Sequence, residues 1–263
     1  MRGVMKNACS VPQTGPSPIP ASLPNSPERS SPSHRRHARS APALPICLPG
    51  LSSHRNKWTS LMEALNRHLF LLLNAPPDPQ TMLLLLARFL ADDVVVLAAA
   101  LIAVLWVWGR HNGRSALVGA GCALLTAALI NTVIGAIWQH PRPFMIGLGH
   151  QLIPHAADSS FPSDHATFMW TIGVSLLLRG SWPRLGWGMM AFGVGVAWAR
   201  IYLGVHFPLD MAGALLVATT ASLLVVPVRP LIDRMLTPAI VRLYEGTVRL
   251  LHLPAALFPL DRG

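Results

Sequence analysis

Residues 115–138, SALVGAGCALLTAALINTVIGAIW, decide the fold, because they form a run of 24 residues without a charged side chain. At a rise of 1.5 Å per residue, a helix of this length extends roughly 36 Å, which is enough to cross a bilayer with some tilt. The whole chain has the same character, with 52% hydrophobic residues, 12% charged residues and a mean hydropathy of +0.44. Such a chain cannot cover a water-facing surface, so we predict an integral membrane protein.

Four further segments are predicted to cross the membrane. They are residues 81–109, with an apolar run from 94 to 108, and residues 163–178, 184–202 and 208–228. Residues 82–90 either lengthen the first span or lie flat, so the prediction is an all-α, polytopic helix bundle of about five spans, or six. Arginine and histidine alternate with apolar residues in 62–74 and 230–263, which predicts helices at the membrane surface.

The N-terminal 61 residues differ from the rest of the chain. They contain eight Lys and Arg against Glu28 alone, so most of the formal net charge of +10 lies there and no nucleic-acid partner is predicted. Their Pro-, Ser- and Arg-rich composition predicts disorder, and they lack the apolar region of a signal peptide. We therefore expect a tail (1–61), a membrane domain (62–229) and an interfacial helix with its own tail (230–263). Two hypotheses stay open: translation starts at Met62, or the tail is real and unstructured.

Basic residues in the short loops predict the orientation. They are Arg110 and Arg114 after the first span, Arg179 and Arg184 after the third, and four arginines after the fifth. Because positively charged short loops face the cytoplasm, these loops are expected on that side. The basic tail would then lie on the opposite side, which favours the Met62 start.

Polar side chains lie at the ends of the spans that are opposite to these basic loops. They are Arg142 after the second span, His165 at the start of the third, Arg200 near the end of the fourth, and His206 and Asp210 at the start of the fifth. Because consecutive spans alternate in direction, all of these residues reach the same, non-cytoplasmic face. Keeping an arginine close to hydrocarbon is costly, which favours one composite functional site over a random scatter of polar residues.

These residue types suit a phosphate group. The guanidinium groups of Arg142 and Arg200 are planar forks that match phosphate oxygens. The Ser163 hydroxyl and the backbone N–H groups at a helix start add donors for the same anion. The sequence therefore predicts a phosphate-binding site.

Two histidines extend this site toward catalysis. A neutral histidine can attack phosphorus, and a carboxylate one helical turn away orients it, which is the spacing of His206 and Asp210. A second histidine, His165, can protonate the leaving oxygen and later accept a proton from water. A single histidine is more often structural than catalytic, so only the set of residues carries this prediction.

The three clusters resemble the tripartite signature of the type-2 phosphatidic acid phosphatase superfamily, Lys-x6-Arg-Pro, Pro-Ser-Gly-His and Ser-Arg-x5-His-x3-Asp. The matching residues are Arg142 and Pro143; Pro162, Ser163, Asp164 and His165; and Ala199, Arg200, His206 and Asp210. Residues 140–144 and 160–167 are in addition similar to the bacterial undecaprenyl-diphosphate phosphatases linked to bacitracin resistance. The resemblance covers roughly residues 62–228.

The resemblance implies a role for each residue. His206 would be the nucleophile, Asp210 would orient it, and His165 would be the general acid and base. Arg142, Ser163 and Arg200 would hold the phosphoryl oxygens, and no metal or other cofactor is implied.

One position departs from the family pattern. Gly135 stands in the place of the family lysine, so one phosphate-binding cation is missing. His140 is a candidate to compensate for it, and His150 and His155 are rival candidates in the same loop.

Three functions are compatible with the sequence. The favoured one is an undecaprenyl-diphosphate phosphatase of the bacterial inner membrane, with its site facing the periplasm or cell exterior, that recycles the lipid carrier of cell-wall synthesis. The second keeps the chemistry on phosphatidic acid, phosphatidylglycerol phosphate or another lipid phosphate. The third is a non-enzymatic anion-binding protein or transporter, which would not need a paired histidine and aspartate. The expected partners are a lipid diphosphate substrate and membrane lipids, and the oligomeric state stays open.

Overall fold

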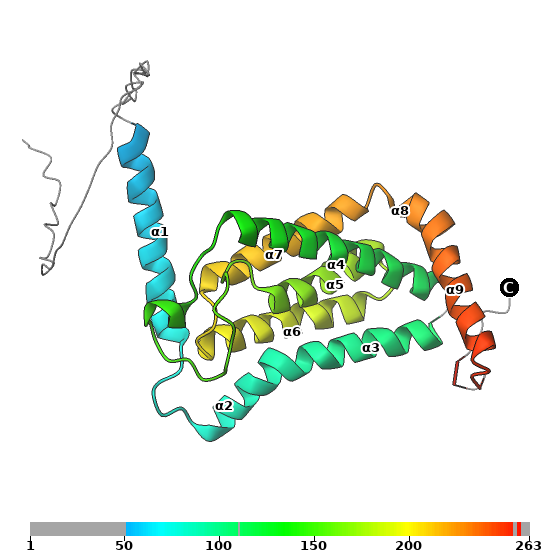
Figure 1. Cartoon of the computed structure of the whole chain (residues 1–263), viewed down its shortest axis with the longest axis horizontal. Coiled ribbons are helices and arrows are strands. Elements are labelled where there is room, and N and C mark those ends of the chain that lie inside the picture. The colour runs from blue at the N-terminus through cyan, green and yellow to red at the C-terminus, as the bar shows by residue number, and fades with distance from the viewer. Residues whose placement is uncertain (1–50, 110, 255–256, 259–263) are drawn as a thin grey trace, which may run out of the picture. The chain divides into compact units, whose positions relative to one another are not determined.

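The computed structural model describes residues 51–109, 111–254 and 257–258, which are helices and connecting loops without strands, so the predicted all-α fold is confirmed. The α-helices are α1 Leu51–Leu73, α2 Thr81–Arg88, α3 Val94–Trp108, α4 His111–Ile137, α5 Asp164–Arg179, α6 Pro183–Tyr202, α7 Pro208–Val225, α8 Arg229–Leu231 and α9 Thr237–Leu250 (Figure 1). Two π-helical segments, η1 Phe89–Asp93 and η3 Ile232–Leu236, and the 3-10 turn η2 Pro143–Ile146 complete the described elements.

Helix α1 starts earlier than predicted. The predicted tail of residues 1–61 lies outside the described residues as far as residue 50, but α1 already begins at Leu51. The helix predicted over residues 62–74 is therefore longer at its N-terminal end than expected. The physical reason is that no proline occurs between Leu51 and Leu73, so backbone hydrogen bonding can continue without a break.

The first span is one continuous helix. Helix α2, the π-helical segment η1 and helix α3 together run from Thr81 to Trp108 over 28 residues. Residues 82–90 therefore lengthen the span rather than lie flat. The π-helical segment shifts the register of the helix at Asp92, and such bulges are frequent at functional sites.

Three helical segments in the described ranges are long and apolar enough to cross a membrane, namely Thr81–Trp108, Gly113–Ile137 and Pro208–Val225. The other two predicted spans are helices at the expected places, α5 and α6. Helix α5 has only 16 residues, and α6 contains Arg184 and Arg200. Helix α5 is surrounded by α4, α6 and α7, so most of its surface contacts protein, whereas α6 keeps large apolar side chains such as Trp187 and Phe192 exposed.

Helix α5 forms the centre of the bundle, where it packs against α4, α6 and α7 (Figure 1). Glycines allow α5 and α6 to approach closely. A Cβ atom added at Gly173 would lie 3.1 Å from the backbone oxygen of Gly186, and one at Gly193 would lie 2.4 Å from the Trp170 ring. Such small residues are typical of helix contacts in membranes.

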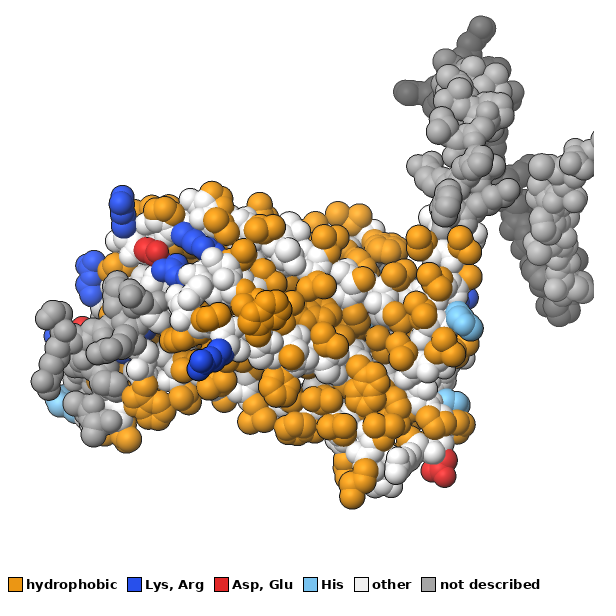
Figure 2. Space-filling view, turned by 180° about the vertical axis from the view of Figure 1, so that it is seen from behind, with side chains coloured by type: hydrophobic (Ala, Val, Ile, Leu, Met, Phe, Trp, Pro, Cys, Tyr) orange, Lys and Arg blue, Asp and Glu red, His pale blue; other side chains and the backbone are white. Residues whose placement is uncertain are grey.

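Polar contacts join two peripheral segments, α1 and η3, to opposite ends of the bundle. At the α1 end, Asn66 is buried and accepts a hydrogen bond from the Leu209 backbone N–H at 3.0 Å. This hydrogen bond connects α1 to the first turn of α7. At the other end, Asp233 of η3 forms an ion pair with Arg179 at 2.9 Å and a hydrogen bond with Ser115. Figure 2 shows hydrophobic side chains over the middle of one face, with most of the visible Lys and Arg gathered toward the α8 and α9 end.

Candidate active site

The predicted site residues meet at the α1 end of the bundle. Arg142 lies in the loop after α4, His165 in the first turn of α5 and Arg200 in the last turn of α6. His206 precedes α7, and Asp210 lies in its first turn. The convergence predicted from alternating spans is therefore present in the described structure.

His206 and Asp210 form a buried pair. His206 Nδ1 lies 3.3 Å from Asp210 Oδ2, and both side chains are at most 2% exposed. The same carboxylate oxygen accepts hydrogen bonds from the Phe207 backbone N–H at 2.7 Å and from the Ser160 hydroxyl. Because Asp210 is held at the start of α7 in this way, its distance to His206 is set by the backbone of the helix turn.

The hydrogen-bond partners of His206 determine which of its ring nitrogens carries the proton. Arg142 Nη1 lies 3.0 Å from His206 Nε2, and a guanidinium can only donate a hydrogen bond. Nε2 therefore accepts, and Nδ1 carries the proton that it donates to Asp210. This tautomer places the lone pair of Nε2 beside Arg142, which is the arrangement that the predicted role of His206 as a nucleophile requires.

Arg142 donates hydrogen bonds to two backbone carbonyl oxygens and to one carboxylate. Its guanidinium donates to the carbonyl oxygen of Val205 at 2.9 Å and to that of Ser159 at 3.2 Å. Its Nε donates to the Asp158 carboxylate at 2.8 Å. The charge of this buried arginine is thus compensated, as burial requires.

Arg200 lies opposite and is paired in a similar way. Its Nη1 donates to Asp92 Oδ1 at 3.0 Å and its Nη2 to His155 Nε2 at 2.9 Å. Its Nε and the Ser163 hydroxyl are buried without a hydrogen-bond partner in the described structure. Buried donors without partners are costly, so an anion that engages both would satisfy them.

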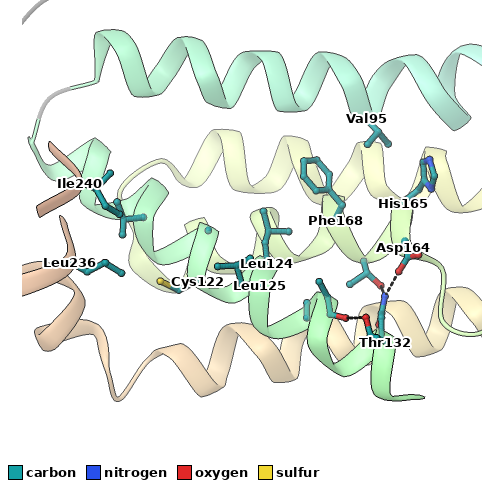
Figure 3. Close-up of a pocket in the computed structure, with 16 residues that line it drawn as sticks. Val95, Cys122, Leu124, Leu125, Thr132, Asp164, His165, Phe168, Leu236 and Ile240 are labelled. Atoms are coloured by element: carbon teal, nitrogen blue, oxygen red, sulfur yellow. Dashed lines mark hydrogen bonds between the residues drawn. The ribbon is translucent and has the colours of Figure 1, made fainter. Parts of the chain in front are cut away.

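His165 lies at the polar end of a long apolar groove. The groove has a volume of about 940 Å³ and is lined by residues of α3, α4, α5, η3 and α9. Figure 3 shows Asp164 and His165 at one end, Leu236 and Ile240 at the other, and apolar side chains such as Phe168 between them. Pockets of roughly 300–1,000 Å³ are typical of ligand sites, and this one suits an apolar chain attached to a polar group.

The candidates for the missing lysine lie in different places. His140 and Gly135 line the same polar pocket of about 560 Å³, but His140 Nε2 faces Glu63 at 3.6 Å and its ring packs on Phe207. The His150 backbone pairs with Asn74. Of these three histidines, only His155 has a described contact with one of the two arginines predicted to bind phosphate, namely Arg200. The role predicted for His140 stays a prediction.

Three site residues were not found from the sequence: Asp92, Asp158 and Ser160. Asp92 is not among the site residues predicted from the sequence, yet its carboxylate pairs with the Arg200 guanidinium. The signal that could have found it is a carboxylate at a span end on the same membrane face as the arginines. Within the described ranges, no group of three or more His, Cys, Asp or Glu side chains could hold a metal ion.

The electrostatics of His206 predict the acid limb of a pH profile. Burial lowers the pKa of His206 to about 4, and the charges of Arg142 and Arg200 act in the same direction, against the effect of Asp210. Attack requires the unprotonated imidazole, so activity is lost as the pH falls through this pKa and is kept above it. The acid limb of kcat/KM for phosphate release is expected to have its midpoint below pH 5. A midpoint at the ordinary histidine value of about 6.5 would contradict this.

The fold and the site together are those of membrane-embedded phosphatases in which a carboxylate orients a histidine. The family model described as the PAP2 superfamily matches residues 116–233. The chain belongs to the PAP2 superfamily.

Individual relatives agree with this assignment. The chain is 40% identical over 158 residues to the putative undecaprenyl-diphosphatase YbjG of Escherichia coli, covering 59% of this chain and 78% of YbjG. It is 34% identical over 164 residues to the undecaprenyl-diphosphatase BcrC of Bacillus subtilis, covering 61% and 81%. The crystal structure of Aquifex aeolicus LpxE has the same fold, with a TM-score of 0.50, 21% identity and coverage of 62% of this chain and 95% of LpxE.

Proposed function

We propose that this membrane enzyme hydrolyses undecaprenyl diphosphate to undecaprenyl phosphate and inorganic phosphate. The observation that carries the proposal is the position of His206 Nε2, which lies 3.0 Å from Arg142 and is oriented by Asp210. The names of the two similar proteins from E. coli and B. subtilis support the same substrate. The apolar groove beside His165 supports a lipid chain as the non-reacting part of that substrate.

The chemistry proceeds in two steps. His206 Nε2 attacks the terminal phosphorus, the bond from phosphorus to the bridging oxygen breaks, and His165 protonates the leaving lipid monophosphate. Water then attacks the phosphohistidine, His165 accepts its proton, and orthophosphate leaves. Arg142, Arg200 and Ser163 bind the phosphoryl oxygens and stabilise the charge of both transition states.

The orientation belongs to the same proposal. Arg114, Arg179 and Arg229 lie at the end of the bundle opposite to the site, close to η3 and α9. Basic residues between and after spans favour the cytoplasmic side. The site then faces the periplasm or cell exterior of a bacterial inner membrane, where the product supports recycling of the lipid carrier.

A substrate panel tests the proposal. The purified protein in detergent is given undecaprenyl diphosphate, phosphatidic acid or phosphatidylglycerol phosphate, and released phosphate is measured. We expect kcat/KM to be at least about tenfold higher for the diphosphate, because its leaving group is a phosphate monoester rather than an alkoxide and needs less acid assistance. A preference for either glycerolipid would favour the second candidate substrate class, and no hydrolysis of any lipid would refute the enzyme activity.

A further inference from the structure

Each phosphate-binding arginine is paired with a carboxylate that is itself open to solvent. The Arg142 side chain is 5% exposed, whereas that of its partner Asp158 is 62% exposed. The Arg200 side chain is 2% exposed, and that of Asp92 is 54% exposed. The two guanidinium groups are therefore enclosed by protein, while one side of each carboxylate faces water.

Asp158 is not needed to hold Arg142 in place. The two terminal nitrogens of Arg142 are anchored on the carbonyl oxygens of Val205 and Ser159 and on the His206 ring, and only Nε donates to Asp158. Removal of the carboxylate would leave those anchors intact. Nε would then be available to another acceptor.

Asp158 and Asp92 differ in the backbone that carries them. Asp158 belongs to the irregular segment between η2 and α5, whereas Asp92 lies within the continuous helix of the first span. Burial alone would raise the pKa of Asp158, but the hydrogen bond and the charge of Arg142 outweigh it and lower the pKa. The carboxylate is therefore ionised at neutral pH and competes with any other anion for Arg142.

On the basis of the proposed function, we propose that Asp158 occupies the phosphate subsite of Arg142 between turnovers and is displaced by the terminal phosphate of the substrate. Carboxylate and phosphate oxygens accept the same charge-assisted hydrogen bonds from a guanidinium, so one can replace the other. Because Asp158 must leave Arg142 before any phosphate group can bind there, the exchange weakens the binding of the lipid diphosphate and of orthophosphate by the same factor. A lipid diphosphate offsets this loss through its chain, whereas free orthophosphate cannot. Asp158 thus favours release of the inorganic product by weakening the binding of orthophosphate.

The variant Asp158→Asn tests this exchange because it removes the charge and keeps the shape. If Asp158 occupies the subsite for about nine-tenths of the time, its loss raises the apparent affinity about tenfold. We expect the KM for the lipid diphosphate and the inhibition constant of orthophosphate to fall about 3- to 10-fold, without an increase in kcat. The matched control is Asp78→Asn, which removes an exposed carboxylate from the loop between α1 and α2 and should change neither constant.

Orthophosphate binding, measured by calorimetry on the full-length protein, decides the proposal without catalysis. Tighter binding to Asp158→Asn than to the wild type supports it, even if no lipid is hydrolysed and the proposed function fails. Equal or weaker binding overturns it, even if undecaprenyl diphosphate is hydrolysed normally. An increased KM in the variant would likewise overturn it, because Asp158 would then support Arg142 rather than compete for it. Asp158→Ser and the thermal melting temperature of each variant check that the fold is unchanged.

Discussion

Replacing His206 with glutamine is expected to abolish phosphate release, with a loss in kcat of at least about 10⁴-fold, comparable to the loss of other catalytic nucleophiles. The side chain that is lost contacts Arg142 through Nε2 and Asp210 through Nδ1. Glutamine can still hydrogen-bond to Asp210, but its amide is not a nucleophile at phosphorus. The measurement is phosphate release from undecaprenyl diphosphate at saturating substrate.

The phosphoenzyme gives a second measurement of the same prediction. Labelled substrate should leave an acid-labile phosphate on the wild-type protein and none on His206→Gln, since His206 is the proposed site of the phosphohistidine. The exposed His68 of α1 provides the control, and His68→Gln should keep both activity and label. Activity within tenfold of the wild type in His206→Gln would refute the nucleophile, provided that its melting temperature shows a folded protein.

Replacing Arg200 with lysine is expected to lower kcat/KM by about 10²- to 10³-fold, although the charge is kept. The Arg200 guanidinium contacts Asp92 through Nη1 and His155 through Nη2, and its Nε is still without a partner. A lysine ammonium is a single point and cannot hold these groups and a phosphoryl oxygen at the same time. The transition state, whose charge is spread over three oxygens, should lose more binding than the ground state.

The kinetics separate this role from a purely structural one. A loss of transition-state stabilisation lowers kcat, whereas a loss of uniform binding raises only KM. Arg67→Lys is the matched control, because Arg67 is an exposed arginine of α1 that pairs with Glu63. A change of less than about threefold in Arg200→Lys would show that Arg200 does not bind the reacting phosphate.

Much of this architecture could be predicted from the chain alone. The spans around residues 115–138 and 208–228 follow from runs of apolar residues, because a bilayer imposes one length on every crossing helix. The common face of Arg142, His165 and His206 follows from the alternation of the spans. The pairing of His206 with Asp210 was predicted from their spacing of four residues. His206 lies just before α7, and the capping contact from the Phe207 backbone N–H to Asp210 at the start of that helix brings the pair together.

The sequence was less informative wherever a contact depends on a loop. Arg200 meets Asp92 and His155, which are 108 and 45 residues away in the chain. Nothing in the local pattern distinguishes His155 from His140 or His150, because all three lie in a segment without helical periodicity. Their roles depend on how this segment folds back over α6 and α7.

The sequence by itself determined the class of protein, the order of its helices and the residues that can bind and attack phosphate. These properties depend on apolar length, helix spacing and side-chain chemistry, all of which are local. Only the tertiary structure decided that Asp158 and Asp92 pair with the two arginines, that the groove runs from His165 to Ile240, and that His140 faces Glu63. The physical reason is that these contacts join segments far apart in the chain, so they form only when the helices have packed and the loops between them have closed.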